Sequence, residues 1–238
     1  MKDKKVLILG GSSDIGIELI KKYLENNWHV FCHYNKNQKV LNNLQKKNKH
    51  KLSIFKANFY DNKSTQNLFN KVKNQSFDSL VNLVGYLDNV SFQKTSLKSL
   101  MKSLQINSII PLLIQKEVLK KMTKNNFGRI LHASSIGVKY GGSEFTFNYS
   151  FSKHAIEYIS SYVKKLSKNN ILTNALRIGV VNTKLLRRVK NKDINKRKKL
   201  IPIQRLATKH EISEMIFFLA SEKNTYISGE IIPISGGE

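Results

Sequence analysis

Short apolar runs alternate with longer segments of helical periodicity along the whole chain, and this alternation restricts the fold more than any other feature. Such a pattern predicts repeated strand-helix units, which form a parallel sheet with helices on both faces. The expected strands are Val6–Leu9, His29–His33, Leu52–Ala57, Ser79–Leu83, Arg129–Ala133, Leu172–Arg177 and Glu230–Ile234. The expected helices are Ile15–Asn26, Ser64–Lys73, Leu97–Met122, Tyr149–Leu166 and Lys209–Ala220, with Pro111 as a candidate bend in the third.

One domain accounts for the full length of the sequence. A chain of 238 residues that is 40% hydrophobic can bury one substantial core, and α/β folds of this size commonly form a single domain. No internal repeat or low-complexity linker divides the sequence. We therefore predict a single, doubly wound α/β domain over residues 1–238, in which the polar segments 35–50 and 183–200 are mobile.

The net charge of +25 raises the question of nucleic-acid binding. Only six of the 41 basic residues are arginines, and the lysines are scattered among many asparagines and isoleucines, which indicates a bias of the whole composition. The one dense basic run, Lys184–Lys199, lacks interleaved aromatic residues. We interpret it as a solvated segment, with a surface for an acidic partner or an anionic substrate as the alternative, and we do not expect nucleic acid as a partner.

The remaining compositional features are typical of a cytoplasmic protein. The start, Met1–Lys5, is charged, and the apolar run Val6–Leu9 is far shorter than a signal-peptide core or a membrane span. Cys32 is the only cysteine, which excludes an intrachain disulfide, and the six histidines show no zinc-ligand spacing. We therefore predict a cytoplasmic protein with neither a membrane span nor a metal site.

The first expected strand leads into a glycine-rich turn, Gly10 to Gly16, which a helix follows directly. Here Gly10 can turn sharply, Gly16 allows close packing of helix on strand, and free N–H groups at the helix start face an anionic pyrophosphate. Asp14 stands where a second glycine is frequent, and we assign it to helix capping. A purely structural turn would also favour glycine and serine. The turn predicts a Rossmann-type nucleotide site with contacts from Gly10, Ser12, Ser13, Asp14, Ile15 and Gly16.

Cofactor choice is expected to depend on the end of the second strand, where the residues are His33, Tyr34, Asn35 and Lys36. An acidic residue there would bind the ribose 2′-hydroxyl of NAD and repel a 2′-phosphate. No carboxylate is present, and Lys36 could pair with a 2′-phosphate. The sequence therefore predicts NADP, with contacts from Tyr34, Asn35 and Lys36.

Tyr149 and Lys153 are four residues apart at the start of an expected helix, so both side chains lie on one face. A free phenol, with a pKa of about 10, is a poor base at neutral pH, and a nearby ammonium would lower that pKa. The spacing alone arises often by chance in a lysine-rich chain. Ser134 and Ser135, however, end the strand upstream of this helix, at the sheet edge where open α/β folds bind ligands.

With these residues in order, the sequence resembles the short-chain dehydrogenase/reductase family over essentially its whole length. The turn from Gly10 to Gly16 looks like the family's cofactor turn, and the residues from Asn82 to Gly85 resemble its Asn-Asn-Ala-Gly strand end. The positions that match the catalytic tetrad are Asn107, Ser135, Tyr149 and Lys153. The segment from Ile178 to Thr183 resembles the family's nicotinamide-binding segment, and residues 201–206 and 227–237 resemble its carboxyl end.

The resemblance implies a reaction and a role for each matched residue. Tyr149 would donate a proton to the substrate oxygen, and Ser135 would hydrogen-bond that oxygen. Lys153 would lower the tyrosine pKa and bind nicotinamide ribose, while Asn107 would hold a water that relays protons. The further cofactor contacts expected from the resemblance are Asn58, Phe59, Asn82, Val84, Gly85, Gly179, Val181 and Thr183.

Three departures from the family pattern leave these catalytic groups intact. Asn58 replaces a common aspartate at the end of the third strand, and Ile178 replaces the usual proline. The spacing from Ser135 to Tyr149 is one residue longer than usual. A substrate lid is expected at residues 183–203.

Among family members, the pattern is most similar to 3-oxoacyl-[acyl-carrier-protein] reductases. Arg129 matches one basic position of that group's carrier surface, and the second is Asn169 with Lys168 beside it. The alternatives are a reductase of a sugar or another polar ketone, or a non-catalytic basic binding protein that retains the fold. Relatives usually form tetramers, and two expected helices, Leu97–Met122 and Tyr149–Leu166, carry surplus apolar residues, so we expect a homotetramer.

Overall fold

The computed structural model describes residues 3–191 and 193–238 and contains a seven-stranded, fully parallel sheet in the order β3-β2-β1-β4-β5-β6-β7. The predicted fold class and all seven predicted strands are confirmed. The strands are β1 Lys5–Leu9, β2 His29–Tyr34, β3 Leu52–Lys56, β4 Ser79–Asn82, β5 Gly128–Ser135, β6 Ile171–Ile178 and β7 Ile231–Ile234. Met1, Lys2 and Lys192, which belong to the charged start and to the dense basic run, lie outside the described residues.

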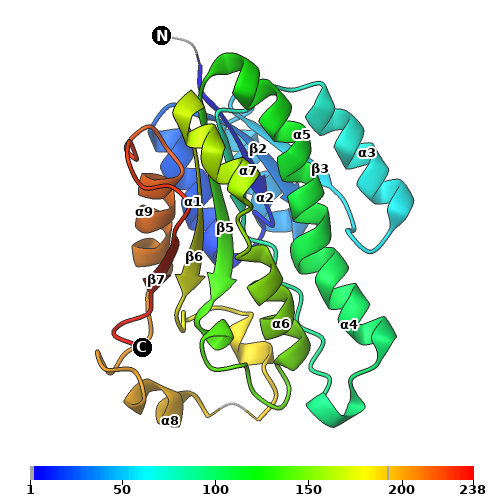
Figure 1. Cartoon of the computed structure of the whole chain (residues 1–238), viewed down its shortest axis with the longest axis vertical. Coiled ribbons are helices and arrows are strands. Elements are labelled where there is room, and N and C mark those ends of the chain that lie inside the picture. Colours follow the sequence, from blue (N-terminus) through cyan, green and yellow to red (C-terminus); the bar gives the residue numbers. More distant parts are fainter. Residues whose placement is uncertain (1–2, 192) are drawn as a thin grey trace.

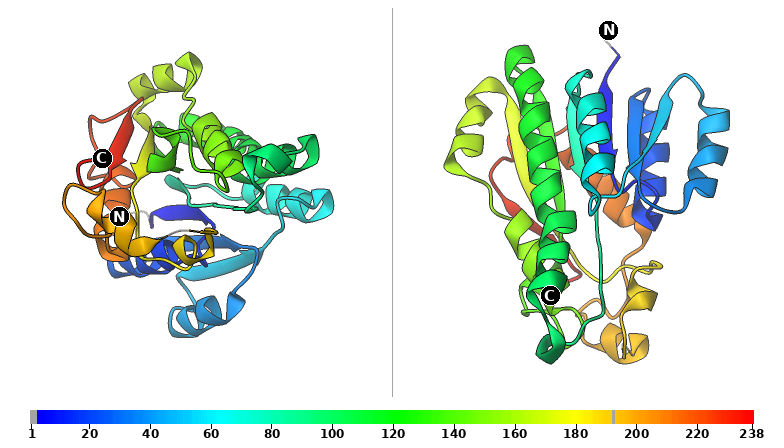
Figure 2. Two further views of the ribbon diagram at one scale, coloured as in Figure 1. Left: turned by 90° about the horizontal axis from the view of Figure 1, so that it is seen from below. Right: turned by 90° about the vertical axis from the view of Figure 1, so that its right-hand side faces the viewer.

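Helices cover both faces of this sheet and produce two separate apolar cores. One core lies beneath α1 (Asp14–Glu25), α2 (Gln38–Lys47) and α9 (Lys209–Leu219), and the other beneath α3 (Asn62–Lys73) and α5 (Ile110–Asn125). The two groups of helices lie on opposite sides when the sheet is viewed from below (Figure 2). Strands covered on both faces read as continuous apolar runs, which explains the run at Val6–Leu9.

The carboxyl ends of the strands point downward in Figure 1, and the segment that carries the short helix α8 (Ile194–Lys199) lies below them. Strand order reverses between β1 and β4, because the chain first builds outward to β3 and then returns to add β4 beside β1. Open α/β sheets bind ligands in the crevice at such a reversal. The fold therefore directs the search for a site to the lower edge of the sheet.

Two predicted helices are interrupted in the structure. The segment predicted as Leu97–Met122 forms α4 (Leu97–Leu104), a π-helical turn at Gln105–Ile109, and α5. Pro111 lies near the start of α5, where it lacks the N–H that a regular helical ladder would use. The interruption thus begins before the proline that we had expected to bend the helix.

The segment predicted as one helix over Tyr149–Leu166 forms α6 (Phe147–Ile156) and α7 (Ser161–Lys165). Ser160 separates them because its extended backbone and its side chain, which accepts a hydrogen bond from the N–H of Val163, cap a new helix. The helix α2 was missed altogether, since only Leu41 among its residues is buried and the apolar signal is weak.

None of the helices within the described residues is long and apolar enough to cross a membrane.

Two histidines are buried in the sheet and are uncharged there. The ring of His33 accepts a hydrogen bond from the N–H of Gly10 and contacts the carbonyl of Ala57, and His132 contacts Asn82 and Gln115. Burial lowers the pKa of His33 to about 4 and that of His132 to about 3. Protonation would place a charge on a side chain that is almost completely removed from solvent.

Acidification should therefore destabilise the fold. Between pH 6.5 and about 4 the unfolded chain binds protons at these two positions that the folded chain does not, so the free energy of unfolding falls as pH drops. The slope should reach about 1.4 kcal/mol per pH unit for each histidine. Urea denaturation between pH 7 and pH 4 measures it, and the variant His132→Gln should show a shallower slope. An unchanged slope would contradict the assignment.

Candidate active site

A cleft of about 1260 Å³ opens at the carboxyl ends of the strands, where the reversal of strand order places it. Most of the predicted site residues line this cleft although they come from widely separated parts of the chain. They are Gly10, Ser12, Ser13, Asp14, Ile15, Asn35, Lys36, Asn58, Phe59, Val84, Gly85, Ser135, Tyr149, Lys153, Gly179, Val181 and Thr183. Gly16, Tyr34, Asn82 and Asn107 are not among the lining residues, and each has a different position and role.

The glycine turn has the geometry that a phosphate-binding turn requires. Gly10 has a φ of +78°, and a Cβ there would lie 3.1 Å from the backbone of Leu83 and Val84. Gly16 cannot carry a side chain either, because a Cβ would lie 2.6 Å from the carbonyl oxygen of Gly11. Its role is therefore close packing beneath the turn rather than contact with a ligand.

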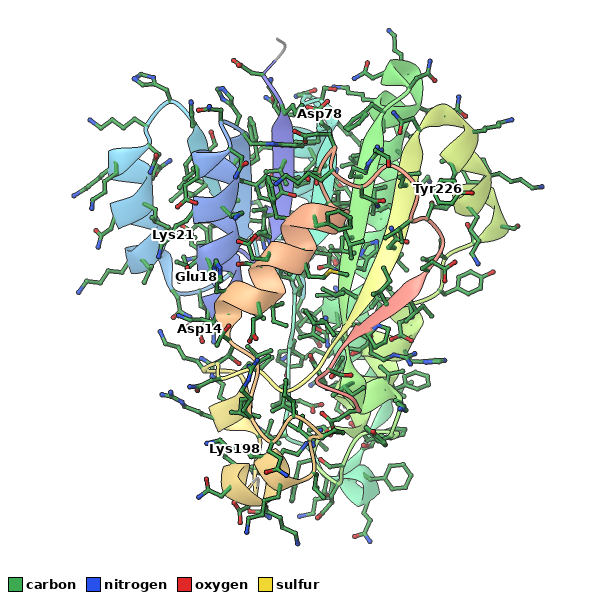
Figure 3. All side chains as sticks on the ribbon, turned by 90° about the vertical axis from the view of Figure 1, so that its left-hand side faces the viewer. Asp14, Glu18, Lys21, Asp78, Lys198 and Tyr226 are labelled. Carbon is green, nitrogen blue, oxygen red and sulfur yellow. The ribbon has the colours of Figure 1, made fainter. Side chains whose placement is uncertain are left out.

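The cap of α1 is Ser13, whose Oγ accepts a hydrogen bond from the N–H of Gly16 at 3.1 Å. Our assignment of helix capping to Asp14 is thus wrong. Its Oδ2 instead accepts a hydrogen bond from the N–H of Lys184 at 2.6 Å, which ties the start of α1 to residues 183–203. Figure 3 shows Asp14 at the end of α1 that lies toward this segment, with Lys198 farther out on α8.

The described parts of the expected lid, residues 183–191 and 193–203, lie at the lower edge of the cleft and are attached to their surroundings at several points. Asn89 donates to the carbonyl of Arg188 at 2.8 Å and accepts from the N–H of Lys190 at 3.2 Å. Arg197 pairs with the carboxylate of Glu238. The position of these residues at the cleft agrees with the predicted substrate lid. That the lid is mobile stays a prediction.

Tyr34 does not contribute to the cleft. Side chains alternate along β2, so Cys32 and Tyr34 point into one core while His33 points to the opposite face. Tyr34 is 4% exposed, and the polar residues that line the cleft after this strand are Asn35, Lys36 and Asn37. The predicted cofactor contact from Tyr34 therefore does not fit the structure, whereas the positions of Asn35 and Lys36 fit the contacts predicted for them.

His33 is a site residue that the sequence analysis missed. Its ring stacks on Phe59 with centroids 4.3 Å apart, and both residues line the cleft. The ring also joins the glycine turn to the end of β3, through Gly10 and Ala57. Only the alternation of β2 could have suggested that a histidine faces this site.

Asn82 supports the site from behind. It is fully buried, its Oδ1 accepts a hydrogen bond from the N–H of Val84 at 3.1 Å, and its Nδ2 faces His132 at 3.3 Å. It therefore holds the turn that presents Val84 and Gly85 to the cleft. Direct contact with a cofactor, which we had expected, does not fit this orientation.

Tyr149 and Ser135 both line the cleft and lie near one another. Burial raises the pKa of Tyr149 to about 12, and a hydrogen bond with Ser135 acts in the opposite direction. We expected Lys153 to lower the pKa of Tyr149, but in the free protein the effect of burial is the larger one. The phenol is consequently protonated at neutral pH, which is the form that can donate a proton.

Lys153 is 2% exposed and donates hydrogen bonds of 2.6 Å to the carbonyl oxygens of Val84 and Ala133. These carbonyls follow β4 and belong to β5, so the ammonium joins α6 to two strand ends. Its Nζ lies 5.8 Å from the centroid of the Tyr149 ring. Burial lowers the pKa of Lys153 to about 7. An ammonium has three protons, and two are committed to main-chain oxygens, so one is left for a ligand.

Asn107 lies in the π-helical turn and is fully buried. Its side chain accepts from the N–H of Tyr86 at 2.6 Å and donates to the carbonyl of Tyr86 at 2.9 Å and to Ser152 at 2.8 Å. Both amide hydrogens are used within the protein. Asn107 therefore holds the strand-end loop against α6, and its role in a proton relay stays a prediction.

Arg129, a candidate for docking an acidic carrier, is 2% exposed. Its guanidinium donates to the carbonyls of Asn224, Gly128 and Asn170 and to the Asn170 side chain. Burial lowers its pKa to about 10. A side chain so enclosed is structural, so the expected match to a carrier surface is wrong at this position.

These features suit a dinucleotide. The glycine turn leaves room for phosphates at the start of α1, Lys36 lies at the edge of the cleft, and Lys153 has a proton to offer. Within residues 3–191 and 193–238, no three histidine, cysteine, aspartate or glutamate side chains gather as a metal site.

A family profile described as enoyl-(acyl carrier protein) reductase matches residues 10–238. The chain belongs to the short-chain dehydrogenase/reductase family. It is an oxidoreductase that acts on alcohol and carbonyl groups. The family resemblance seen in the sequence is thereby confirmed.

Known proteins resemble this chain in sequence and in fold. The 3-oxoacyl-[acyl-carrier-protein] reductase FabG of Aquifex aeolicus is 32% identical over 177 residues, which are 74% of this chain and 70% of the relative. The structure of ElxO with NADP bound is 26% identical, with a TM-score of 0.84 over 99% of this chain and 98% of the other. The NADPH-dependent reductase YwfH, involved in bacilysin biosynthesis, shares the fold at 21% identity, with a TM-score of 0.87 over 99% and 98% of the two chains.

Proposed function

We propose that this protein is an NADPH-dependent reductase of 3-oxoacyl thioesters. The observation that carries the proposal is the placement of Tyr149 and Ser135 near one another at one point in the wall of the cleft, with Lys153 beside the Tyr149 ring. A carbonyl oxygen that becomes an alkoxide needs a proton donor and a second hydrogen-bond donor at that point.

In the proposed reaction, Tyr149 donates its proton to the substrate oxygen. Ser135 donates a hydrogen bond to the same oxygen and stabilises the charge that develops there. Lys153, held by two carbonyls, keeps a positive charge near the phenolate that Tyr149 becomes. NADPH, when bound, supplies the hydride, and its carboxamide would be held by Thr183 and the backbone from Gly179 to Val181.

The choice of a 3-oxoacyl thioester rests on the resemblance to FabG. The buried Arg129 removes one argument for a protein carrier, so acyl thioesters of a small carrier such as coenzyme A are equally suitable test compounds. A polar ketone remains the second candidate. The family profile is named for an enoyl reductase, so a 2-enoyl thioester belongs in the same assay.

The variant Tyr149→Phe tests the mechanism. Removal of the hydroxyl should reduce turnover by at least about a hundredfold, because the proton donor is lost, while NADPH affinity should change little. The measurement is NADPH oxidation with 3-oxoacyl and 2-enoyl thioesters and with small polar ketones, together with fluorescence titration of NADPH. Turnover of Tyr149→Phe at the unmodified rate would rule out the proposed role, and preference for the enoyl compounds would rule out the proposed substrate.

We propose NADPH over NADH because Lys36 lines the cleft and no carboxylate follows β2. One charge-assisted hydrogen bond to a 2′-phosphate is worth about 1 to 2 kcal/mol, or about tenfold in affinity. Lys36→Ala should weaken NADPH binding about tenfold and leave NADH unaffected. Asn35→Asp should reverse the preference. Equal binding of both cofactors by the unmodified protein would refute this proposal.

We also propose a homotetramer in the cytoplasm. The single cysteine fits the location, and exposed apolar residues on α4, α5 and α6 support self-association, among them Met101, Leu113 and Phe151. Light scattering at micromolar concentration should give about four times the 27.3 kDa chain mass. A monomer would contradict the proposal.

A further inference from the structure

Glu157 is a buried carboxylate just beyond the end of the helix that carries Tyr149 and Lys153. It is 4% exposed, and it lies one helical turn after Lys153. A carboxylate is retained in such a place only if its charge is paired and its oxygens are hydrogen-bonded. Nothing in the proposed reaction uses this group, so its presence needs an explanation.

Three hydrogen bonds from two neighbouring strands reach this carboxylate. Ser134 Oγ donates to Oε1 at 2.6 Å, and Arg177 donates to Oε1 through Nε at 2.9 Å and to Oε2 through Nη2 at 2.7 Å. The arginine contact is the bidentate kind, which fixes direction as well as distance. His154 Nδ1 lies 3.8 Å away on the exposed side.

The partners of Glu157 lie beside the reacting groups in the sheet. Ser134 pairs with Arg177 across β5 and β6, and the next pair is Ser135 with Ile178. On β5, Ser134 is followed by Ser135, which is proposed to contact the substrate oxygen. On β6, Arg177 is followed by Ile178 and then by Gly179, where the proposed nicotinamide-binding segment begins. Ser134 Oγ also lies 3.3 Å from the main-chain oxygen of Lys153. One carboxylate therefore joins α6 to both strand ends.

The other end of α6 is anchored separately. Asn148 is fully buried and donates to Asp88 at 2.7 Å, and Thr95 donates to Asn148 at 3.2 Å. The part of α6 that carries Tyr149 and Lys153 thus lies between two buried anchors, the amide of Asn148 and the carboxylate of Glu157. Of these two anchors, only the carboxylate contacts β5, which ends at Ser135, and β6, which ends just before Gly179.

We propose that Glu157, through Arg177 and Ser134, is a positioning residue that sets α6 against β5 and β6 and so aligns Tyr149 and Lys153 with Ser135. The inference rests on the proposed function, since it assigns the alignment of those three groups. Glu157 does not touch the reacting atoms. Misplacement of a reacting group by a fraction of an ångström to one ångström is enough to lower turnover by about ten- to a hundredfold.

The test is the variant Glu157→Gln, which keeps the size of the side chain and removes its charge. We expect kcat for reduction of a 3-oxoacyl thioester to fall about tenfold, with little change in KM. Arg177→Met should show a similar loss of kcat. The kcat of the double variant should be no lower than that of the less active single variant, because both substitutions break the same contact between Glu157 and Arg177. Additive losses, or an unchanged kcat in folded Glu157→Gln, would overturn the proposal.

A matched control exists at the surface. Arg205 and Glu211 form another bidentate pair, at 2.6 and 3.0 Å, and Glu211 also accepts a hydrogen bond from the N–H of Thr208, the N-cap of α9. Glu211→Gln should lower the melting temperature and leave kcat unchanged. If it lowers kcat as much as Glu157→Gln does, the effect is general destabilisation and the proposal fails.

Two further variants separate the possible failures. If Glu157→Gln does not fold, the variant Ser134→Ala is the test, because it removes the hydrogen bond from Ser134 to Glu157 and leaves the ion pair between Arg177 and Glu157 intact. An unchanged kcat of Ser134→Ala would contradict the proposal, and a clear loss of kcat would support it. Tyr149→Phe is assayed alongside. An active Tyr149→Phe overturns the proposed function itself, whereas an inactive one beside a fully active Glu157→Gln overturns only the positioning role.

Discussion

The ammonium of Lys153 lies inside the protein, where two main-chain carbonyl oxygens compensate its charge. An isolated buried ammonium would be very costly, so these two contacts determine where the helix α6 can lie. The carbonyls come from the ends of neighbouring strands, and both ends must be held in place. Asn82 holds the first through Val84, and His132, beside Ala133, is itself held by Asn82 and Gln115. The buried polar side chains of Asn82, His132 and Gln115 thus help to hold the two carbonyl groups that bind the ammonium of Lys153.

Burial also determines the protonation states from which the site starts. It raises the pKa of Tyr149 to about 12 and lowers that of Lys153 to about 7, so the proton affinities of the two groups, which are similar in water, move apart. The phenol is ready to donate a proton, and the lysine can take or release one near neutral pH. A site open to water would leave both groups at their ordinary values.

The sequence predicted the sheet and the cleft well, because both depend on patterns that repeat along the chain. Apolar runs marked every strand, and strand ends marked Ser135, Gly85 and Gly179. What it missed depends on contacts between distant residues. The direction of the Tyr34 side chain depends on which face of β2 packs against α1. The helix breaks after Glu157 because Ser160 caps a new helix. Arg129 is enclosed because its guanidinium donates hydrogen bonds to the carbonyls of Asn170 and Asn224. Asp14 could not be assigned from the turn alone, since its partner Lys184 is 170 residues away.

The central claim is that this cleft transfers hydride from NADPH to a carbonyl carbon. The most direct measurement uses NADPH deuterated at C4 of the nicotinamide, in both stereochemical forms, with a 3-oxoacyl thioester. The account predicts that one form alone delivers deuterium to the carbinol carbon of the 3-hydroxyacyl product, because a fixed site presents one face of the ring. The variant Tyr149→Phe should yield no labelled product on the same timescale. Product without deuterium from either form, or no product from any carbonyl compound, would contradict it.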